Sequence, residues 1–383
     1  MKRILVLVMV VTCSENLFAQ QIGHTAVTFI DSSRNNRTIP AEIYYPALTA
    51  GDNTPIATGI FPLITFGHGF VMTWSAYQNF WETLVPEGYI VVFPTTEGGL
   101  SPNHADFGED LRFLITKIQG SGAGTSVPQT SVGITSAIMG HSMGGGSSFL
   151  AAENNSVITT MVSFAAANTN PSSIVAAQNI SVPILLFSGS NDCVTPPPQH
   201  QDIMYDSAAS AYKTQVYVTA GGHCYFANYN FNCTFGESTC SPSPAITRAE
   251  QQSAVNDFLK PWLAYFLKGD CTKAQEFQDS LVASNRITYR QSQSIACPSG
   301  INESFSSPDF IWVFPNPTGE FLNINLQKEK VKDVIMYDVI KNKVLAHYIS
   351  NPDEKIIVDI SSLKTGIYFV AVNNKHWAKF LKR

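Results

Sequence analysis

The chain has 383 residues, of which 44% are hydrophobic, 11% aromatic and only 14% charged, and its formal net charge is −5. At about 150 residues per domain, this length predicts two or three domains, while the aromatic content and low charge exclude a disordered chain. A nucleic-acid-binding protein is excluded as well, because it needs a basic balance that is absent here. The seven cysteines are an odd number, so they cannot all pair with one another.

The first residues have the parts of a secretory signal peptide. Lys2 and Arg3 precede the apolar run 4–11, and Ala19 offers a small residue at the cleavage position, which predicts a leader over residues 1–19. Lipid attachment at Cys13 is the alternative, but the threonine before it stands where a Gly or Ala is expected. No later run approaches about 18 apolar residues, so an integral membrane protein is not expected.

Strand-like apolar runs then alternate with helical stretches as far as about residue 297, which is typical of an α/β sheet. We predict strands over residues 61–66, 89–93, 136–139, 182–187 and 215–219. Several of them are apolar at consecutive positions, as expected for strands that helices cover on both faces. Helical spacing predicts helices over 108–118 and 249–267, the second one kinked at Pro261.

The sharpest motif follows the third of these strands. Residues 140–144 read G-H-S-M-G, and a helical run begins by residue 149. A G-x-S-x-G sequence between a strand and a helix makes a tight turn that exposes the serine hydroxyl, and glycines are needed because larger side chains would collide. A Gly-rich turn that arose by chance is the alternative. The strand-turn-helix context favours Ser142 as a nucleophile.

A serine nucleophile needs a base and an acid, which in this fold follow in the order Ser, Asp or Glu, His. Asp192 and His223 supply that order, and each comes just after a predicted strand, where an open α/β sheet collects its site. The alternatives, which fit this order or placement less well, are the histidines at 68, 104, 141 and 200 and the aspartates at 202 and 206.

The oxyanion of acyl transfer must be met by backbone N–H groups. Met143, the residue after the nucleophile, supplies one, and the loop after the first predicted strand should supply the other. Phe70 in that loop is the candidate, with its ring over the acyl pocket, although the loop could be only a Gly-rich turn. We expect His141 to help shape the substrate cleft and His68 to hold the loop.

These residues resemble the α/β-hydrolase superfamily and, within it, the bacterial cutinases and PET hydrolases (polyesterases). The similar stretches lie between residues 55 and 270: 140–147, 151–155, 182–184, 191–192, 205–207 and 221–223. The resemblance implies that Ser142, Asp192 and His223 form the catalytic triad, that Phe70 and Met143 form the oxyanion hole, and that the substrate is an ester or polyester. Residues 165–168 depart from the family, because they read A-A-A-N where a tryptophan usually lines the cleft.

Without the leader, six cysteines remain, which suits three disulfides in an exported chain. They are Cys193, Cys224, Cys233, Cys240, Cys271 and Cys297. Six cysteines allow 15 connectivities. We expect a bridge between the cysteines at 193 and 224, which follow the proposed acid and base, as one subgroup of PET hydrolases has a bridge near the site. The other two bridges would then be 233–240 and 271–297. Zinc at His223 and the cysteines at 224 and 233 is a weaker alternative.

The character of the sequence changes after residue 297. Residues 313–383 hold 11 Lys and Arg against 7 Asp and Glu, whereas residues 20–312 hold 11 against 21. Short alternating segments predict a small all-β sandwich. The motifs at 315–319 and 363–368 and the basic end resemble the C-terminal sorting domain of the Bacteroidota type IX secretion system. A carbohydrate-binding module is the alternative, but the terminal position favours sorting and removal of the tail.

The sequence therefore predicts four parts: a signal peptide (1–19), an α/β-hydrolase domain with a mostly parallel sheet (20–300), a linker (301–311) and a sorting domain (312–383). We expect a secreted, monomeric serine esterase that uses no cofactor and no metal. Its partners would be an ester or polyester and the type IX secretion machinery. The alternatives are a dienelactone-hydrolase-like or lipid acyl esterase and, from another class, a non-catalytic surface-binding module.

Overall fold

The computed structural model describes residues 20–297 and 311–383, except for 315, 317, 327–329, 339–341, 354 and 374. The chain divides into two compact units, one ending at Pro298 and the other beginning at Ser299. The predicted leader and residues 301–310 of the predicted linker lie outside the described residues. Each unit is described by itself.

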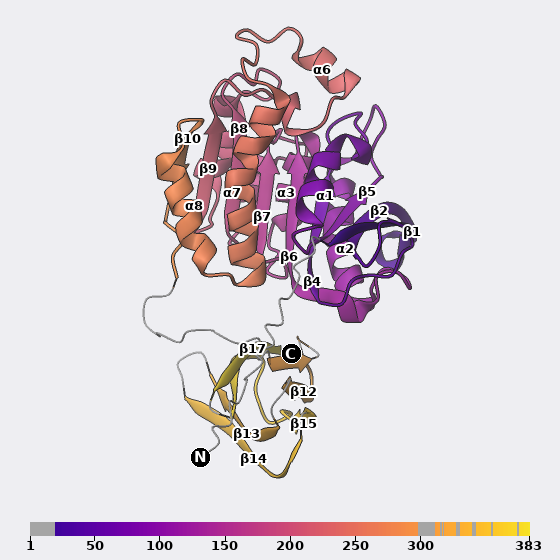
Figure 1. The fold of residues 1–383 in the computed structure, drawn as a ribbon, viewed down its shortest axis with the longest axis vertical. Coiled ribbons are helices and arrows are strands. Elements are labelled where there is room, and N and C mark those ends of the chain that lie inside the picture. The colour runs from indigo at the N-terminus through magenta and orange to yellow at the C-terminus, as the bar shows by residue number, and fades with distance from the viewer. Residues whose placement is uncertain are drawn as a thin grey trace, which may run out of the picture. The chain divides into compact units, whose positions relative to one another are not determined.

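One sheet runs through the first unit, in the strand order β10-β9-β8-β7-β6-β4-β5-β2-β1-β3 (Figure 1). The strands from β5 to β9 pair in parallel, whereas β2 joins β5, β1 joins β2 and β10 joins β9 in antiparallel fashion. The bounds are β1 Gln21–Asp31, β2 Arg37–Ala47, β3 Gly51–Asp52, β4 Phe61–Gly67, β5 Ile90–Pro94, β6 Val132–His141, β7 Thr160–Phe164, β8 Ile184–Gly189, β9 Lys213–Val218 and β10 Ile287–Gln291.

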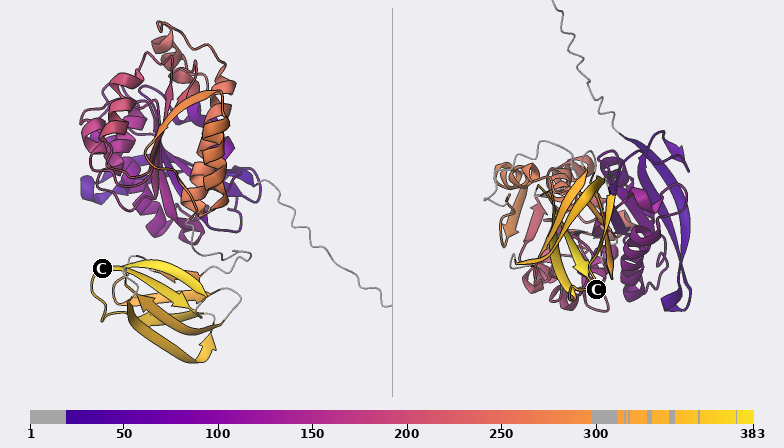
Figure 2. Two further views of the ribbon diagram at one scale, coloured as in Figure 1. Left: turned by 90° about the vertical axis from the view of Figure 1, so that its left-hand side faces the viewer. Right: turned by 90° about the horizontal axis from the view of Figure 1, so that it is seen from below.

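Helices cover both faces of this sheet (Figure 2). Their bounds are α1 Gln78–Leu84, α2 His104–Ser121, α3 Met143–Ala152, α4 Ser173–Ala177, α5 Gln201–Ser207, α6 Phe231–Glu237, α7 Arg248–Lys268 and α8 Thr272–Ala283. One hydrophobic core joins the sheet to α1, α7 and α8, and the other joins it to α2, α3, α4 and α5. The predicted α/β fold with a mostly parallel sheet flanked by helices is confirmed.

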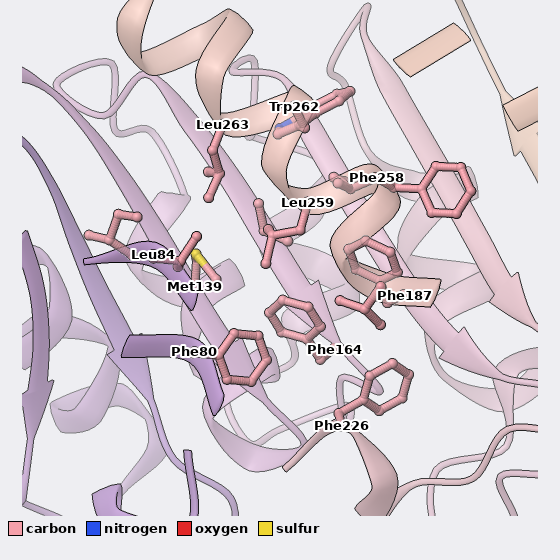
Figure 3. Close-up of a cluster of buried hydrophobic side chains, with 14 of the residues drawn as sticks. Phe80, Leu84, Met139, Phe164, Phe187, Phe226, Phe258, Leu259, Trp262 and Leu263 are labelled. Carbon is pink, nitrogen blue, oxygen red and sulfur yellow. The ribbon is translucent and has the colours of Figure 1, made fainter. Parts of the chain in front are cut away.

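The apolar runs in the strands follow from this double cover. In β8, Leu185 and Phe187 face the first core while Ile184 and Leu186 face the second, because successive side chains point to opposite faces. Figure 3 shows part of the first core, in which phenylalanines from several elements pack beside α7. Phe226 belongs to this cluster, so the segment that follows β9 is anchored in the core.

Five strands lie where the sequence predicts them, but β1, β2, β3, β7 and β10 were missed. Burial alternates along β1 and the first part of β2, but most of the buried positions in β1 carry Gly, Thr or Asp, and β2 contains two prolines. Alternating apolar residues therefore do not mark either strand in the sequence, and β7 is only five residues long. Pro261 lies inside α7, which continues past it to Lys268. No helix among the described residues is both long and apolar enough to cross a bilayer.

The second unit contains two antiparallel sheets, β11-β12-β15 and β14-β13-β16-β17. The strands are β11 Ile311–Phe314, β12 Phe321–Leu326, β13 Val331–Tyr337, β14 Lys343–Asp353, β15 Lys355–Asp359, β16 Gly366–Val372 and β17 His376–Lys382. Alternate residues from both sheets share one buried cluster, for example Leu322 and Ile324 with Val334 and Val370. The predicted small all-β sandwich is confirmed.

Candidate active site

The order of the strands brings two distant loops together at one edge of the sheet. The chain runs from β4 to β5 on one side and then returns to place β6 on the other side of β4, with Gly67 opposite Gly140. Such a switch point opens a crevice beyond the carboxyl ends of the strands. The loop after β4, which carries Phe70, therefore lies beside the turn after β6, which carries Ser142.

The turn after β6 has the shape that its glycines allow. Ser142 has φ 56° and ψ −119°, a backbone conformation that residues other than glycine rarely adopt. A Cβ on Gly140 would overlap the carbonyl of Gly144, and a Cβ on Gly144 would overlap the carbonyl of Gly67. Glycine is therefore required at both positions if α3 is to begin directly behind the serine.

The structure joins the side chains of Ser142, His223 and Asp192 in one hydrogen-bonded chain. The Oγ of Ser142 lies 2.9 Å from Nε2 of His223. On the other side of the ring, Nδ1 of His223 lies 2.9 Å from Oδ2 of Asp192. All three residues are at least nine-tenths buried. With Nδ1–H donating to the carboxylate, the Nε2 lone pair is directed at the serine hydroxyl.

The Asp192 carboxylate is fixed by its own loop. Its Oδ1 accepts the backbone N–H groups of Val194 and Thr195 at 2.8 Å each, and the Thr195 hydroxyl lies 2.9 Å from Oδ2. Burial opposes ionisation, but the nearby His223 and these hydrogen bonds outweigh it and hold the pKa of Asp192 below its usual range. The carboxylate thus stays charged and oriented at neutral pH.

The predicted oxyanion donors are available. Within residues 20–297, neither the N–H of Met143 nor that of Phe70 has a protein acceptor. The Phe70 side chain is 46% exposed. On the side where relatives were expected to carry tryptophan, Ala165 and Ala166 are fully buried, and the N–H of Ala167 donates to the carbonyl of Ser142 at 3.0 Å. Small side chains therefore line that side of the serine.

His141 connects the loop that carries Phe70 to the loop that carries His223. Its Nε2–H donates to the carbonyl of His223 at 3.0 Å, its Nδ1 lies 3.0 Å from the Tyr77 hydroxyl, and that hydroxyl accepts the N–H of Gly69 at 2.7 Å. Complete burial, reinforced by His223, lowers the pKa of His141 to about 3. A neutral imidazole with one donor and one acceptor nitrogen fits this chain of hydrogen bonds.

The alternative bases and acids are engaged elsewhere. The Nδ1 of His200 accepts the N–H of Asn168 at 2.9 Å, and His104 lies beside the backbone of Asn170. His68 is buried within 2.9 Å of two loop carbonyls. The two aspartates also have other partners: Asp202 accepts the hydroxyl of Tyr217 at 2.6 Å, and Asp206 pairs with Arg290 at 2.9 Å.

The expected pairing of the disulfides is wrong for two of the three bridges. Cys193 pairs with Cys240 and Cys224 pairs with Cys233, whereas the expected pair 271–297 is present. The reason is the course of residues 224–240, here called the strap. It leaves His223, forms α6, and returns so that Cys233 lies over Cys224 and Cys240 lies over Cys193. The strap thus connects the loop of Asp192 to the loop of His223, in place of the expected direct bridge between residues 193 and 224.

The strap also brings a carboxylate to the backbone of the proposed base. The Oε1 of Glu237 accepts the N–H of His223 and, at 3.2 Å, the N–H of Cys224. Burial raises the pKa of Glu237, although the two N–H groups and the His223 ring oppose that shift. Sequence reasoning missed Glu237, Thr195 and Tyr77, because no motif marks them and each acts on a residue from another part of the chain.

The zinc alternative loses its ligands in this arrangement. Cys224 and Cys233 are joined to each other, so neither offers a thiolate. The described residues contain no group of three or more His, Cys, Asp or Glu side chains that could hold a metal ion.

A mostly parallel sheet flanked by helices, with a serine on a strained turn after β6, defines the chain as an α/β hydrolase. A family model described as PET hydrolase-like matches residues 12–241, which is more than half of the chain, so the chain belongs to this family. The model of the secretion system C-terminal sorting domain matches residues 312–382. No curated protein matches the chain. The protein is a secreted serine ester hydrolase, extracellular or attached to the cell surface.

Proposed function

We propose that the protein cleaves esters through a covalent acyl-enzyme formed on Ser142. The observation that supports this most is the chain of two 2.9 Å hydrogen bonds from Ser142 through His223 to Asp192. Nucleophile, base and orienting acid lie within the distances that acyl transfer requires.

In the first half of the reaction, Oγ of Ser142 attacks the ester carbonyl while Nε2 of His223 takes the hydroxyl proton. The carbonyl oxygen gains the negative charge and is met by the N–H groups of Met143 and Phe70. Asp192 holds the ring and stabilises its charged form. Collapse of the tetrahedral intermediate breaks the C–O bond, and His223 returns the proton to the departing alcohol.

In the second half, water replaces the alcohol. His223 takes a proton from the water as it attacks the acyl carbonyl, and the same two N–H groups meet the oxyanion again. The acid leaves when the proton returns to Oγ of Ser142. No step calls for a cofactor or a metal ion.

We propose that polyesters, including aromatic ones such as PET, are among the substrates. Membership of the PET hydrolase-like family and the exposed side chain of Phe70, in the loop next to the turn of Ser142, support this. The small side chains at 165–167 leave one side of the serine without an aromatic ring, so we expect slower turnover of PET than of small soluble esters.

We further propose that residues 20–300 form the catalytic domain of a monomer and residues 312–383 the sorting domain that the type IX machinery reads. The matched span 312–382 and the division of the chain into two units support this assignment.

The decisive experiment compares wild type with Ser142→Ala on p-nitrophenyl esters of increasing chain length and on PET film. We expect the variant to lose at least about 10⁴-fold in kcat. Ser163→Ala is the matched control, since Ser163 is also a buried serine but its hydroxyl has no partner within residues 20–297. Equal turnover by wild type and Ser142→Ala would exclude the serine mechanism.

A further inference from the structure

Helix α6 exposes two phenylalanines on the same face. Phe231 is 69% exposed and Phe235 is 72% exposed, and their rings stack with centroids 6.3 Å apart at an interplanar angle of 22°. Residues four apart lie on one side of a helix, so the two rings form one continuous apolar surface, here called the aromatic pair. A contiguous exposed apolar surface, unlike a single exposed side chain, is a candidate site of interaction.

The helix that carries the pair is firmly held. Cys233 within α6 is bonded to Cys224, and Cys240 just after it is bonded to Cys193. The Asn230 side chain caps the start of the helix by accepting the N–H of Cys233 at 3.1 Å. A surface held in one conformation before binding loses little entropy when a ligand docks. The rings are thus presented to solvent by a pre-organised element.

The two ends of α6 touch the loops on either side of Ser142. Near its start, Nδ2 of Asn232 donates to the carbonyl of Val71 at 3.0 Å, directly after the proposed oxyanion donor Phe70. At its end, Glu237 accepts the N–H of His223. Figure 1 shows α6 projecting beyond the helix and sheet layers of the unit. Helix α6 therefore bridges the two loops that carry Phe70 and His223, and it presents the aromatic pair on the exposed side of that bridge.

The chemistry around the pair selects a neutral ligand. From residue 225 to residue 246, the one charged residue in the sequence is Glu237, and its side chain is buried. Tyr229, 69% exposed, adds a third aromatic side chain next to the pair in sequence. A surface without exposed charge offers nothing to a nucleic acid or a charged peptide, whereas stacked rings match flat aromatic groups.

We propose that Phe231 and Phe235 form a substrate-binding subsite that holds an aromatic ring of the ester chain outside the scissile bond. This proposal rests on the proposed ester hydrolysis at Ser142. It adds that the strap binds aromatic groups of the substrate. Residues 165–167 are alanines, so the exposed aromatic surface of the strap is not duplicated at these positions.

The test is adsorption to amorphous PET film, measured as binding isotherms in the inactive Ser142→Ala background. Phe231→Ala/Phe235→Ala should weaken adsorption at least about tenfold, because both rings lose their apolar contact. The adsorption of Phe231→Leu/Phe235→Leu should lie between that of the alanine variant and that of the unchanged pair. Tyr289→Ala on β10 is the control for loss of an exposed aromatic ring elsewhere and should adsorb normally.

The same substitutions in the active chain separate this proposal from the proposed function. We expect p-nitrophenyl acetate turnover within about twofold of wild type and PET hydrolysis reduced in proportion to adsorption. Unchanged adsorption by the alanine variant would overturn the subsite, and wild-type adsorption by the leucine variant would overturn its aromatic character. If the wild type is a dimer and the alanine variant is a monomer, the pair binds a second copy of the chain instead. Failure of Ser142 as nucleophile appears separately, as turnover in Ser142→Ala.

Discussion

The turn that carries Ser142 and the strap that reaches the backbone of His223 are built in opposite ways. The turn is made of seven consecutive residues, and its conformation follows from glycines that let the backbones of Gly144 and Gly67 touch. The strap has no such local code. Its position depends on disulfides to residues 9 and 47 positions away and on a buried carboxylate. The nucleophile is therefore a local feature, whereas the placement of its base is a property of the assembled fold.

The largest expected effect concerns Asp192, which orients the base that lies between the turn and the strap. Asp192→Asn should lower kcat for a soluble ester about 10⁴-fold, because the amide favours the wrong tautomer of His223. Asp206→Asn, which alters an exposed partner of Arg290, should leave kcat unchanged. Steady-state kinetics on both variants decides this, and a loss of less than about tenfold in Asp192→Asn would mean that the serine acts without this relay.

Removing the bridge between the acid loop and the strap should have the next largest effect. Cys193→Ser/Cys240→Ser opens a loop with a sequence separation of 47, and the chain-entropy relation gives a loss of about 4 kcal/mol in unfolding free energy. We also expect a lower kcat at temperatures below the melting transition, because the loops of Asp192 and His223 are no longer tied to each other.

Cys271→Ser/Cys297→Ser is the matched control for that bridge. It opens a loop with a sequence separation of 26 away from the strap and should cost about 3.5 kcal/mol in stability, with kcat unaffected. Urea unfolding and ester kinetics measured side by side make the comparison. Equal loss of kcat in both double variants would show that the strap has no special part in positioning the base.

Glu237 should act as a positioning residue. Glu237→Ala leaves the buried N–H groups of His223 and Cys224 without their acceptor, which should cost about 2 kcal/mol in stability. We expect kcat to fall about tenfold with KM unchanged, which is the pattern for a group acting through the base. Glu237→Gln keeps an acceptor oxygen and should restore most of kcat. If the glutamine variant behaves like alanine, the charge rather than the hydrogen bonds matters.

The smallest expected effect concerns how the unfolding free energy depends on pH through His141, a residue of the turn. Burial lowers the pKa of His141 to about 3, below its value of about 6.5 in the unfolded chain. Below pH 6.5 the unfolded state therefore binds a proton that the folded state does not, and stability falls by up to about 1.4 kcal/mol per pH unit.

His141→Gln removes this contribution while keeping a donor and an acceptor. Unfolding free energies measured at pH 7 and pH 5.5 should fall about 1 kcal/mol less in the variant than in wild type. His68 and His200, whose pKa values burial also lowers, contribute to both proteins and cancel. Parallel curves would show that His141 is protonated in the folded chain.

The sequence predicted the central strands well, because their consecutive apolar residues reflect cover on both faces. It also predicted which side chains would meet, since Ser142, Asp192 and His223 each follow a strand and parallel strands end at one edge. It missed β7, because this strand is only five residues long and two of them, Thr160 and Ser163, are polar. It missed Thr195 and Glu237, because an isolated threonine or glutamate carries no signal until its partner is known.

The sequence by itself therefore determined the turn at residues 140–146, the order of the strands' functional residues and the export tail, since these depend on neighbours along the chain. Only the tertiary structure decided which cysteines pair, where α6 lies and what holds His223. The physical reason is that hydrogen bonds and disulfides between loops depend on distances across the fold, and residues 9 to 47 positions apart in sequence carry no local record of those distances.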